Sequence, residues 1–220
     1  MKMKSIRAVI FDMDGVLVDS EPVWQQAELN ILQPLGVPIT HADTLLTTGL
    51  RVDELVQYWY RSHPWDNYDN QQTSNDIIEA VITFIKANAK PMQGVIEALT
   101  ACKSHNLKIG LATSSSMNIV NAVLTKLNIA HYFDKIHSAE HLPYGKPHPE
   151  VYLNCATDLG VQPRQCLAIE DSFNGLIAAR AANMQTLAIP PQELQHQDRW
   201  VIAHHNASNL TELPQIISSI

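Results

Sequence analysis

The amino-acid sequence predicts an α/β fold in which a doubly wound parallel sheet carries an inserted all-helical domain. Short apolar runs recur and each ends in polar residues, helical patterns separate these runs, and residues from about 20 to 89 contain helical patterns without a convincing strand. Strands that alternate with helices are typical of a parallel sheet covered on both faces. We therefore expect a Rossmann-like core with a helical cap inserted after its first strand.

The strands of this sheet are predicted from four compact apolar runs. Strands that are buried on both faces have nearly continuous hydrophobic sequences. The runs are residues 6–11 (IRAVIF), 107–113 (LKIGLAT), 165–170 (QCLAIE) and 185–189 (QTLAI). Between them, apolar residues at the spacing i, i+3, i+4, i+7 indicate helices over residues 95–102 and 120–127.

The insertion is predicted from helix-start signals. Proline suits the first turn of a helix, and a serine suits the N-cap. On these signals we expect helices from Pro22 toward Leu35, over Val52 to Ser62 and from a Ser74 cap to Ala89, with a polar loop over residues 63–72. The expected division is a core of residues 1–19 and 90–220 and a cap of residues 20–89.

Composition limits the class of partner. A chain of 220 residues, 45% of them apolar, is long enough to bury a sizeable core. The 22 acidic side chains outnumber the 15 basic ones, and no run of Lys or Arg exists that could neutralise a string of phosphates. We therefore expect no nucleic-acid partner. Any small anion must be held by local cations, a metal ion or backbone N–H groups, because the net charge is −7.

The cysteines and the N-terminal segment point to the cytoplasm. Three cysteines without a C-x-x-C spacing suggest neither a disulfide framework nor a zinc site. Residues 1–7 carry charge and lead into an apolar run of residues 8–11, which is far shorter than a signal or membrane-spanning segment. We expect a cytoplasmic protein with no membrane partner and, because heptads are lacking, a monomer.

Polar residues follow the predicted strands at the positions where an open α/β sheet binds its ligands. In chain order they are Asp12-Met13-Asp14-Gly15, Thr113-Ser114, Gly145-Lys146-Pro147 in a later loop, and Glu170-Asp171-Ser172. Each group alone has an ordinary structural explanation as a turn, a helix cap or a solvated lysine. Their joint occurrence at successive strand ends is improbable by chance.

These residue types suit the transfer of a phosphoryl group. Two carboxylates two residues apart, Asp12 and Asp14, can divide the roles of nucleophile and proton donor. A carboxylate that attacks phosphate needs compensating positive charge, and the carboxylates at the next strand end are oxygen ligands of the kind that Mg²⁺ prefers. Thr113 and Ser114 can donate hydrogen bonds to phosphate oxygens, and Lys146 offers a compact cation.

The four motifs resemble those of the haloacid dehalogenase-like hydrolases with a helical cap. They are FDMDGVLVDSE (11–21), LATSSS (111–116), GKPHPEVY (145–152) and IEDSFNG (169–175). The resemblance implies that Asp12 is the nucleophile and Asp14 the general acid and base. It also implies phosphate binding by Thr113, Ser114 and Lys146. The implied Mg²⁺ ligands are Asp12, Asp14 through its carbonyl, and Asp171, with Glu170 behind them.

Two further segments resemble bacterial phosphatases that act on hexose and hexitol phosphates, 2-deoxyglucose 6-phosphate among them. The segments are TTGLRVDEL (47–55) and SAEHLPYGKPHP (138–149). A small sugar phosphate is therefore the expected substrate. Arg51 has two interpretations, as a contact to the distal end of that substrate or as a surface ion pair.

Two alternatives stand beside the sugar phosphatase. The first is a β-phosphoglucomutase-type mutase, which resembles this chain in all four motifs. In that mutase a histidine ten residues after the second motif aspartate assists proton transfer, whereas this chain has Trp24 there, and an indole cannot shuttle protons. The second is a binding module without catalysis, which the presence of every motif residue argues against.

Overall fold

The computed structural model describes residues 6–220, so the expectations for residues 1–5 lie outside it. The described residues form a six-stranded sheet in the order β3-β2-β1-β4-β5-β6, with every paired strand parallel. The strands are β1 (Ala8–Phe11), β2 (Lys108–Thr113), β3 (Lys135–Ser138), β4 (Cys166–Glu170), β5 (Gln185–Ala188) and β6 (His205–Asn206). The expected doubly wound α/β fold is confirmed.

The four strands predicted from apolar runs are all present, within two residues of the predicted ends. Two more strands were not predicted. The sequence of β3, KIHS, has no apolar run because β3 lies at one edge of the sheet and is only half buried. At the other edge, β6 has just two residues, too few to give a pattern.

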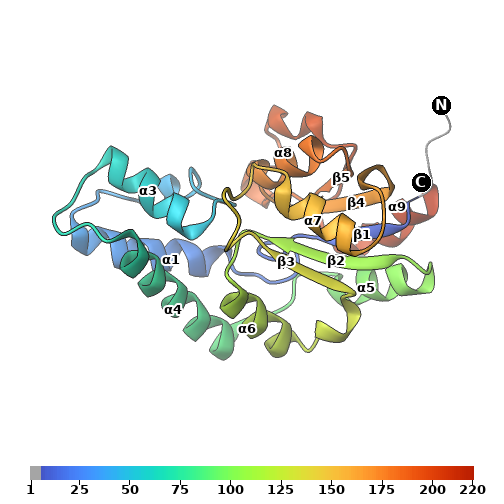
Figure 1. Cartoon of the computed structure of the whole chain (residues 1–220), viewed down its shortest axis with the longest axis horizontal. Helices are drawn as coiled ribbons and strands as arrows, with labels where there is room; N and C mark the ends of the chain where they lie inside the picture. Colours follow the sequence, from blue (N-terminus) through green and yellow to red (C-terminus); the bar gives the residue numbers. More distant parts are fainter. Residues whose placement is uncertain (1–5) are drawn as a thin grey trace.

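Helices cover both faces of the sheet (Figure 1). Side chains alternate along β1, so that Val9 and Phe11 belong to one apolar cluster and Ala8 and Ile10 to another. The first cluster includes residues of α5 (Val95–Ser104), α6 (Met117–Leu127) and α9 (Leu213–Ser219). The second includes residues of α7 (Glu150–Asp158) and α8 (Phe173–Ala181). Short 3-10 helices lie at Ala130–Tyr132, Pro163–Gln165, Gln192–Leu194, Asp198–Ile202 and Leu210–Glu212.

A helical lobe projects from one end of the sheet (Figure 1). It contains α1 (Glu21–Leu32), a 3-10 helix (Gln33–Leu35), α2 (His41–Thr44), α3 (Val52–Ser62) and α4 (Asn70–Asn88). The prediction of α3 is confirmed at both ends. The prediction that Ser74 caps the last helix is wrong, because the Asp69 side chain accepts a hydrogen bond from Gln72 N at 3.0 Å and starts α4 at Asn70. The polar loop predicted over residues 63–72 therefore ends at Asp69.

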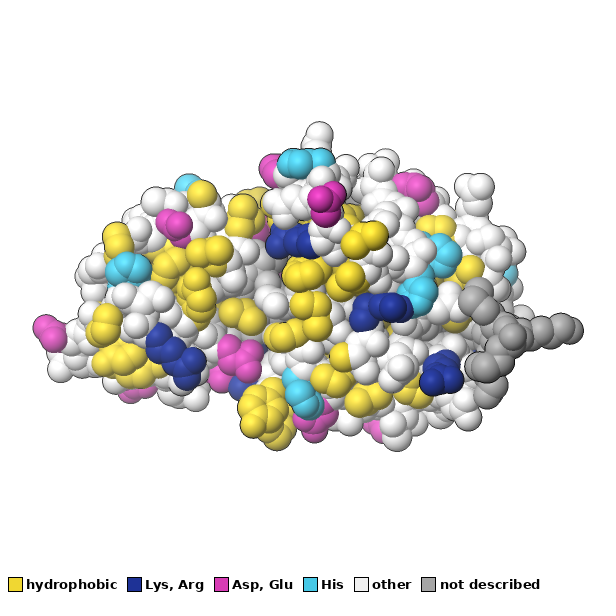
Figure 2. Space-filling model, turned by 90° about the horizontal axis from the view of Figure 1, so that it is seen from above, with side chains coloured by type: hydrophobic (Ala, Val, Ile, Leu, Met, Phe, Trp, Pro, Cys, Tyr) yellow, Lys and Arg dark blue, Asp and Glu magenta, His cyan; other side chains and the backbone are white. Residues whose placement is uncertain are grey.

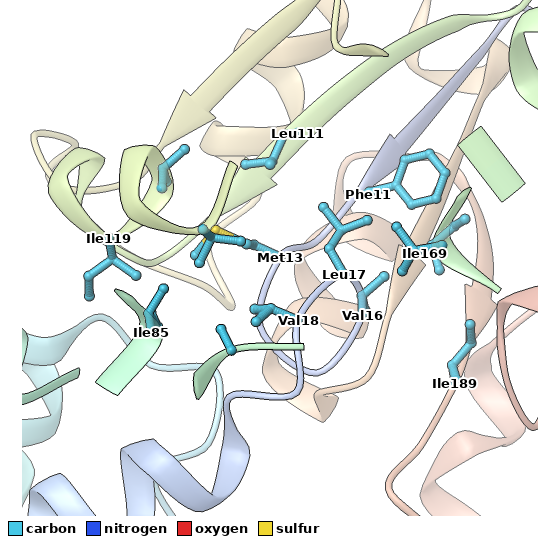
Figure 3. Packing of buried hydrophobic residues seen from close by; sticks show 14 of the residues in the cluster. Phe11, Met13, Val16, Leu17, Val18, Ile85, Leu111, Ile119, Ile169 and Ile189 are labelled. Carbon is cyan, nitrogen blue, oxygen red and sulfur yellow. The ribbon is translucent and has the colours of Figure 1, made fainter. Parts of the chain in front are cut away.

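The chain enters and leaves this lobe at neighbouring positions. Val18 pairs with Pro91 in an antiparallel bridge, and Asp19 N donates to Lys90 O at 3.2 Å. Val18, just before the crossing, and Ile85, near the end of α4, belong to the same apolar cluster (Figure 3). We propose that residues 20–89 are a cap domain on a core of residues 1–19 and 90–220.

Candidate active site

The sheet brings the predicted site residues to one edge. The strand order reverses between β1 and β4, and open α/β sheets bind ligands at such a point, beyond the carboxyl ends of the strands. Asp12 directly follows β1, and Asp171 directly follows β4. Thr113 ends β2, and Lys146 reaches the same place from the loop between β3 and α7. Asp12, Asp171 and Lys146 are all buried.

The loop after β1 is held by apolar anchors between its two aspartates. Asp12 N donates to Ile169 O at 3.0 Å, which keeps the first aspartate in register with β4. Met13 and Leu17 are fully buried and point into the apolar cluster beneath the loop (Figure 3). Gly15 has a φ of 70°, and a Cβ there would collide with the Asp171 carboxylate. Glycine therefore permits both the turn and the close approach of Asp171.

Lys146 is the centre of a buried ionic cluster. Its Nζ donates to Asp12 Oδ1 at 2.5 Å, to Glu170 Oε1 at 2.6 Å and to Ala112 O at 2.9 Å. The Tyr152 hydroxyl also donates to Glu170 Oε1, at 2.5 Å. Burial opposes the charge on the lysine, but the carboxylates of Asp12 and Glu170 raise its pKa above the ordinary value. Lys146 is therefore a fixed cation beside Asp12.

Three carboxylates at this point can hold a cation. Oxygens of Asp12, Glu170 and Asp171 lie within 4.8 Å of one another. Glu170 already accepts from Lys146 and Tyr152, and its other oxygen accepts from Ser172 Oγ at 3.1 Å. Asp12 and Asp171 are thus the carboxylates with oxygens left for a metal ion. Such hard oxygen ligands fit Mg²⁺.

The pKa values of these acids also favour a cation. Burial raises the pKa of Asp12 to about 8, with Glu170 and Asp14 adding to the rise and Lys146 opposing it. Burial and the neighbouring carboxylates likewise raise the pKa of Asp171 well above its usual range. Closely packed buried acids stay ionised together only when positive charge compensates them. The lysine supplies one such charge, and the donor set fits a divalent ion as the second.

Asp14 lies in a different environment from Asp12. Its Oδ1 accepts from Ser20 Oγ at 2.6 Å and from Trp24 Nε1 at 2.9 Å, and its Oδ2 accepts from Ser115 Oγ at 2.6 Å. The donors come from the cap boundary, from α1 and from the loop after β2. Asp14 is therefore oriented by neutral donors, whereas Asp12 faces the lysine.

Thr113 and Ser114 lie at the site, and the hydroxyl group of each already takes part in a hydrogen bond. Thr113 Oγ1 accepts from Ser115 N at 3.0 Å, and Ser114 Oγ donates to Gly49 O in the helical lobe at 3.1 Å. Both residues line a cavity of about 60 Å³ together with Asp12, Asp14, Lys146 and Asp171. The lobe closes this cavity from the other side.

Several contacts of the site were not predicted. Ser20 and Ser115 hold Asp14, and the only signal for them was that each lies beside a motif. Tyr152 lies inside the motif GKPHPEVY, where no role was assigned to it. Trp24 was noted as the residue that stands in place of the mutase's histidine, and it contacts Asp14 directly. A hydroxyl or an indole becomes recognisable as a positioning group only when its distant partner is known.

Arg51 forms an ion pair, as one of its two predicted roles required, but the arginine is largely buried. Its side chain is only 11% exposed and pairs with Asp53 at 2.5 Å. Its Nη1 also donates to Ala139 O at 2.9 Å and to Leu142 O at 2.6 Å, which joins the lobe to the core loop ahead of Lys146. Arg51 does not line the cavity beside Asp12. Arg51 and its hydrogen bonds to Ala139 and Leu142 thus form a clasp that joins the lobe to the core.

The remaining features have structural explanations. His137 lies in β3 and contacts Asp158 at 3.1 Å, and His141 is an exposed residue beside Glu140. The three cysteines are free and buried. Acidic and basic side chains are scattered over the face drawn in Figure 2, without a broad basic band. Within residues 6–220, no helix is both long and apolar enough to span a membrane.

Comparisons with known proteins agree with this geometry. The model of the family described as haloacid dehalogenase-like hydrolase matches residues 9–189. Hexitol phosphatase B of Escherichia coli (strain K12) is 44% identical over 211 residues, which are 96% of this chain and 95% of that protein. Fructose-1-phosphate phosphatase YqaB of the same strain is 29% identical over 181 residues, 82% of this chain and 95% of that protein.

A solved structure gives the same result at the level of the fold. The β-phosphoglucomutase of Clostridium difficile superposes with a TM-score of 0.81 at 27% identity, covering 94% of this chain and 93% of that chain. The family match spans most of the chain and both halves of the sheet. The protein therefore belongs to the haloacid dehalogenase-like hydrolase family.

Proposed function

We propose that this protein is a Mg²⁺-dependent phosphatase that hydrolyses small hexose or hexitol phosphates, such as 2-deoxyglucose 6-phosphate, through an aspartyl-phosphate on Asp12. The observation that carries the proposal is that the two motif aspartates lie in different surroundings. Asp12 faces Lys146 at 2.5 Å, whereas Asp14 is held by neutral donors from Ser20, Trp24 and Ser115. Two carboxylates in different surroundings suit the two roles of nucleophile and proton carrier.

The substrate class is supported by the relatives. Hexitol phosphatase B and the fructose-1-phosphate phosphatase both carry a phosphorylated hexose or hexitol in their names, and the first shares 44% of its residues with this chain over nearly its whole length. We further propose that the enzyme is a cytoplasmic monomer. Three cysteines without a paired spacing and the lack of heptads support this proposal.

The residues of this chain divide the reaction into two steps. A carboxylate oxygen of Asp12 attacks phosphorus, the bond between phosphorus and the sugar oxygen breaks, and Asp14 gives its proton to that oxygen. Asp14 then takes a proton from water as the water attacks the phosphorus of the aspartyl-phosphate, which releases phosphate and restores Asp12. Lys146 balances the charge on Asp12 and the phosphate, and Thr113 and Ser114 bind phosphate oxygens.

The metal ion would be held by Asp12, Asp171 and the Asp14 carbonyl. When bound, Mg²⁺ supplies positive charge that lowers the repulsion between the Asp12 carboxylate and the phosphate. Glu170 would stay behind these ligands, because its oxygens hold Lys146, Tyr152 and Ser172. Its role is to fix the lysine beside the nucleophile.

A mutase of the same fold is the second candidate. Structural likeness to a β-phosphoglucomutase supports it. The indole of Trp24 argues against it, because this side chain donates to Asp14 and can neither take up nor release a proton. We expect at most weak interconversion of a sugar bisphosphate.

Phosphate release from a panel of phosphorylated metabolites tests the proposal. With Mg²⁺ we expect the highest kcat/KM for a hexose or hexitol phosphate. Excess chelator should abolish turnover, and Ca²⁺ should support it poorly because this ion prefers more ligands and longer bonds. Full turnover in chelator would remove the metal from the mechanism. A preference for phosphates without a hexose or hexitol would overturn the substrate assignment.

A further inference from the structure

One face of α1 forms a wall of the cavity. Glu21, Trp24 and Glu28 lie at the spacing i, i+3, i+7, and all three line the cavity that holds Asp12 and Asp14. Trp24 is the member that contacts Asp14, through its indole N–H. Glu28 lies four residues later, so it is about 6 Å farther along the helix from the catalytic pair. The cavity thus has a phosphate end and a Glu28 end.

Glu28 is a buried acid with few partners. The residue is 4% exposed, and its Oε2 contacts Thr47 Oγ1 at 3.1 Å. Thr47, which is 1% exposed, also lines the cavity. Within residues 6–220 this contact is the one hydrogen bond of normal geometry that the Glu28 carboxyl makes. A buried carboxyl group normally satisfies more of its hydrogen-bonding capacity than this.

The proton count at Thr47 indicates a neutral carboxyl. A hydroxyl has one proton to donate, and Thr47 Oγ1 lies 3.0 Å from Thr44 O as well as 3.1 Å from Glu28. A protonated Glu28 can donate to Thr47, which then donates to the Thr44 carbonyl. Burial raises the pKa of Glu28 to about 8, although Thr47 and the indole of Trp59 oppose the rise.

At this end of the cavity, Glu28 and Thr47 are the residues that can make polar contacts with a ligand. Leu50 and Leu55 form an apolar part of the wall. Glu21 lies nearer the core and already accepts from Gln25 at 3.2 Å and from Thr48 at 3.3 Å. Ligand sites of this kind use a few convergent polar groups on apolar walls to fix orientation. Glu28 and Thr47 are such groups.

We propose that Glu28 and Thr47 bind hydroxyl groups at the end of the substrate opposite its phosphate, and so select polyol and sugar phosphates long enough to reach them. A neutral carboxyl can both donate to and accept from a hydroxyl, which suits a polyol better than it suits a charged group. The inference rests on the proposed sugar phosphatase activity and specifies how that activity chooses its substrate.

The test compares different substrates in four variants, one of which is Glu28→Gln. Glu28→Leu and Thr47→Val remove the polar groups while keeping the shape. Thr44→Val is the matched control, because this buried hydroxyl donates to His41 O and does not line the cavity. The substrates are a hexitol phosphate, 2-deoxyglucose 6-phosphate, glycerol 3-phosphate and an aryl phosphate. Thermal unfolding is measured for every variant to establish that it folds.

We expect the first two variants to lose about 10- to 100-fold in kcat/KM on the hexitol phosphate and on 2-deoxyglucose 6-phosphate. Glycerol 3-phosphate is too short to reach Glu28, and the aryl phosphate has no sugar hydroxyl for Glu28 to bind, so their values should stay within about 3-fold of wild type. Glu28→Gln keeps a neutral donor and acceptor, and it should retain most of the activity on the hexitol phosphate. Thr44→Val should match wild type on every substrate.

The possible outcomes distinguish a failure of this inference from a failure of the proposed function. If wild type hydrolyses hexitol phosphates but the loss in Glu28→Leu and Thr47→Val is equal on all substrates, or missing, then the inference fails and the phosphatase stands. Should Glu28→Leu not fold, Thr47→Val decides by the same criterion. If wild type cleaves the aryl phosphate and no sugar phosphate, the proposed function fails and the inference fails with it.

Discussion

At the scale of single residues, the division of labour between the two motif aspartates is the central expectation. A sugar alkoxide is a poor leaving group that needs a proton, so Asp14→Asn should slow phosphoenzyme formation from sugar phosphates by about 10²–10⁴-fold. An aryl phosphate leaves as a stabilised phenolate and needs that proton less. Stopped-flow absorbance with an aryl phosphate should therefore show a burst of phenolate, stoichiometric with enzyme, before a slow steady state.

Asp12→Asn is the control for this experiment. It removes the nucleophile, so no phosphoenzyme should form from any substrate. A burst from Asp12→Asn would mean that the roles of the two aspartates are reversed. Equal losses on sugar and aryl phosphates in Asp14→Asn, without a burst, would contradict the proton-transfer role.

Glu28 should also make stability depend on pH. Folding raises its pKa from 4.5 to about 8, so the folded state binds this proton more tightly than the unfolded chain does. Wild type therefore loses stability, relative to a chain without the acid, as pH rises through that window. The free energy of unfolding of Glu28→Gln minus that of wild type should be constant below pH 4.5 and should grow up to about pH 8. Urea unfolding at several pH values measures it, and a flat difference would contradict a buried neutral acid.

The site residues differ in how well the sequence could predict them. Asp12, Asp14 and Asp171 were predicted because each belongs to a motif at a strand end, and the sheet brings all strand ends to one edge. Lys146 was predicted from a motif in a later loop. The supporting hydrogen bonds of these residues could not be predicted. The bond from Ser115 to Asp14 joins residues 101 positions apart, and no local pattern encodes that pairing.

At the scale of elements, the segment from Gly49 to Glu54 holds the lobe against the core. Arg51 donates to the carbonyls of Ala139 and Leu142, and Glu54 accepts from Gly145 N at 2.9 Å. A Cβ on Gly145 would lie 2.6 Å from a Glu54 carboxylate oxygen and 2.9 Å from Arg51 Cβ, so a larger residue in the loop that carries Lys146 would have to displace these side chains of the lobe. Closure of the lobe and the position of the lysine are therefore coupled.

Arg51→Met tests this clasp. The substitution keeps an unbranched side chain but removes the donors, so the closed state should be populated less and KM for sugar phosphates should rise by about 5- to 50-fold. Arg61→Met, an exposed position at the end of α3, is the matched control and should behave as wild type. Steady-state kinetics measure both. Unchanged KM in Arg51→Met would show that closure does not need the clasp.

The elements themselves were predictable where pattern and burial coincide. The helix over Val52 to Ser62 was predicted at both ends because its apolar stripe is strong and Ser62 precedes a polar loop. The start of α4 was missed by five residues, because Asp69 and Ser74 are both acceptable caps and only the fold decides between them. The edge strand β3 was missed because half-buried strands lack a continuous apolar run.

At the scale of the whole molecule, the two chain crossings allow the lobe to move as a unit. We expect hinges near Asp19-Ser20 and Lys90-Pro91, where the backbone pairs only through short bridges. Limited proteolysis should cut at these crossings in the free enzyme and more slowly with a phosphate mimic and Mg²⁺. The rate of cutting at a loop of the core provides the internal reference. Unchanged cutting at both crossings with the mimic bound would count against closure.

The chain passes from the core to the lobe and back beside the Val18–Pro91 bridge. The lobe therefore takes the place of one surface loop of the α/β sheet. All six strands lie outside this inserted segment, and so do Asp12, Lys146 and Asp171. The inserted segment can therefore vary while the nucleophile, the lysine and the carboxylates of the core are kept, except where the insert itself supplies Trp24 to Asp14.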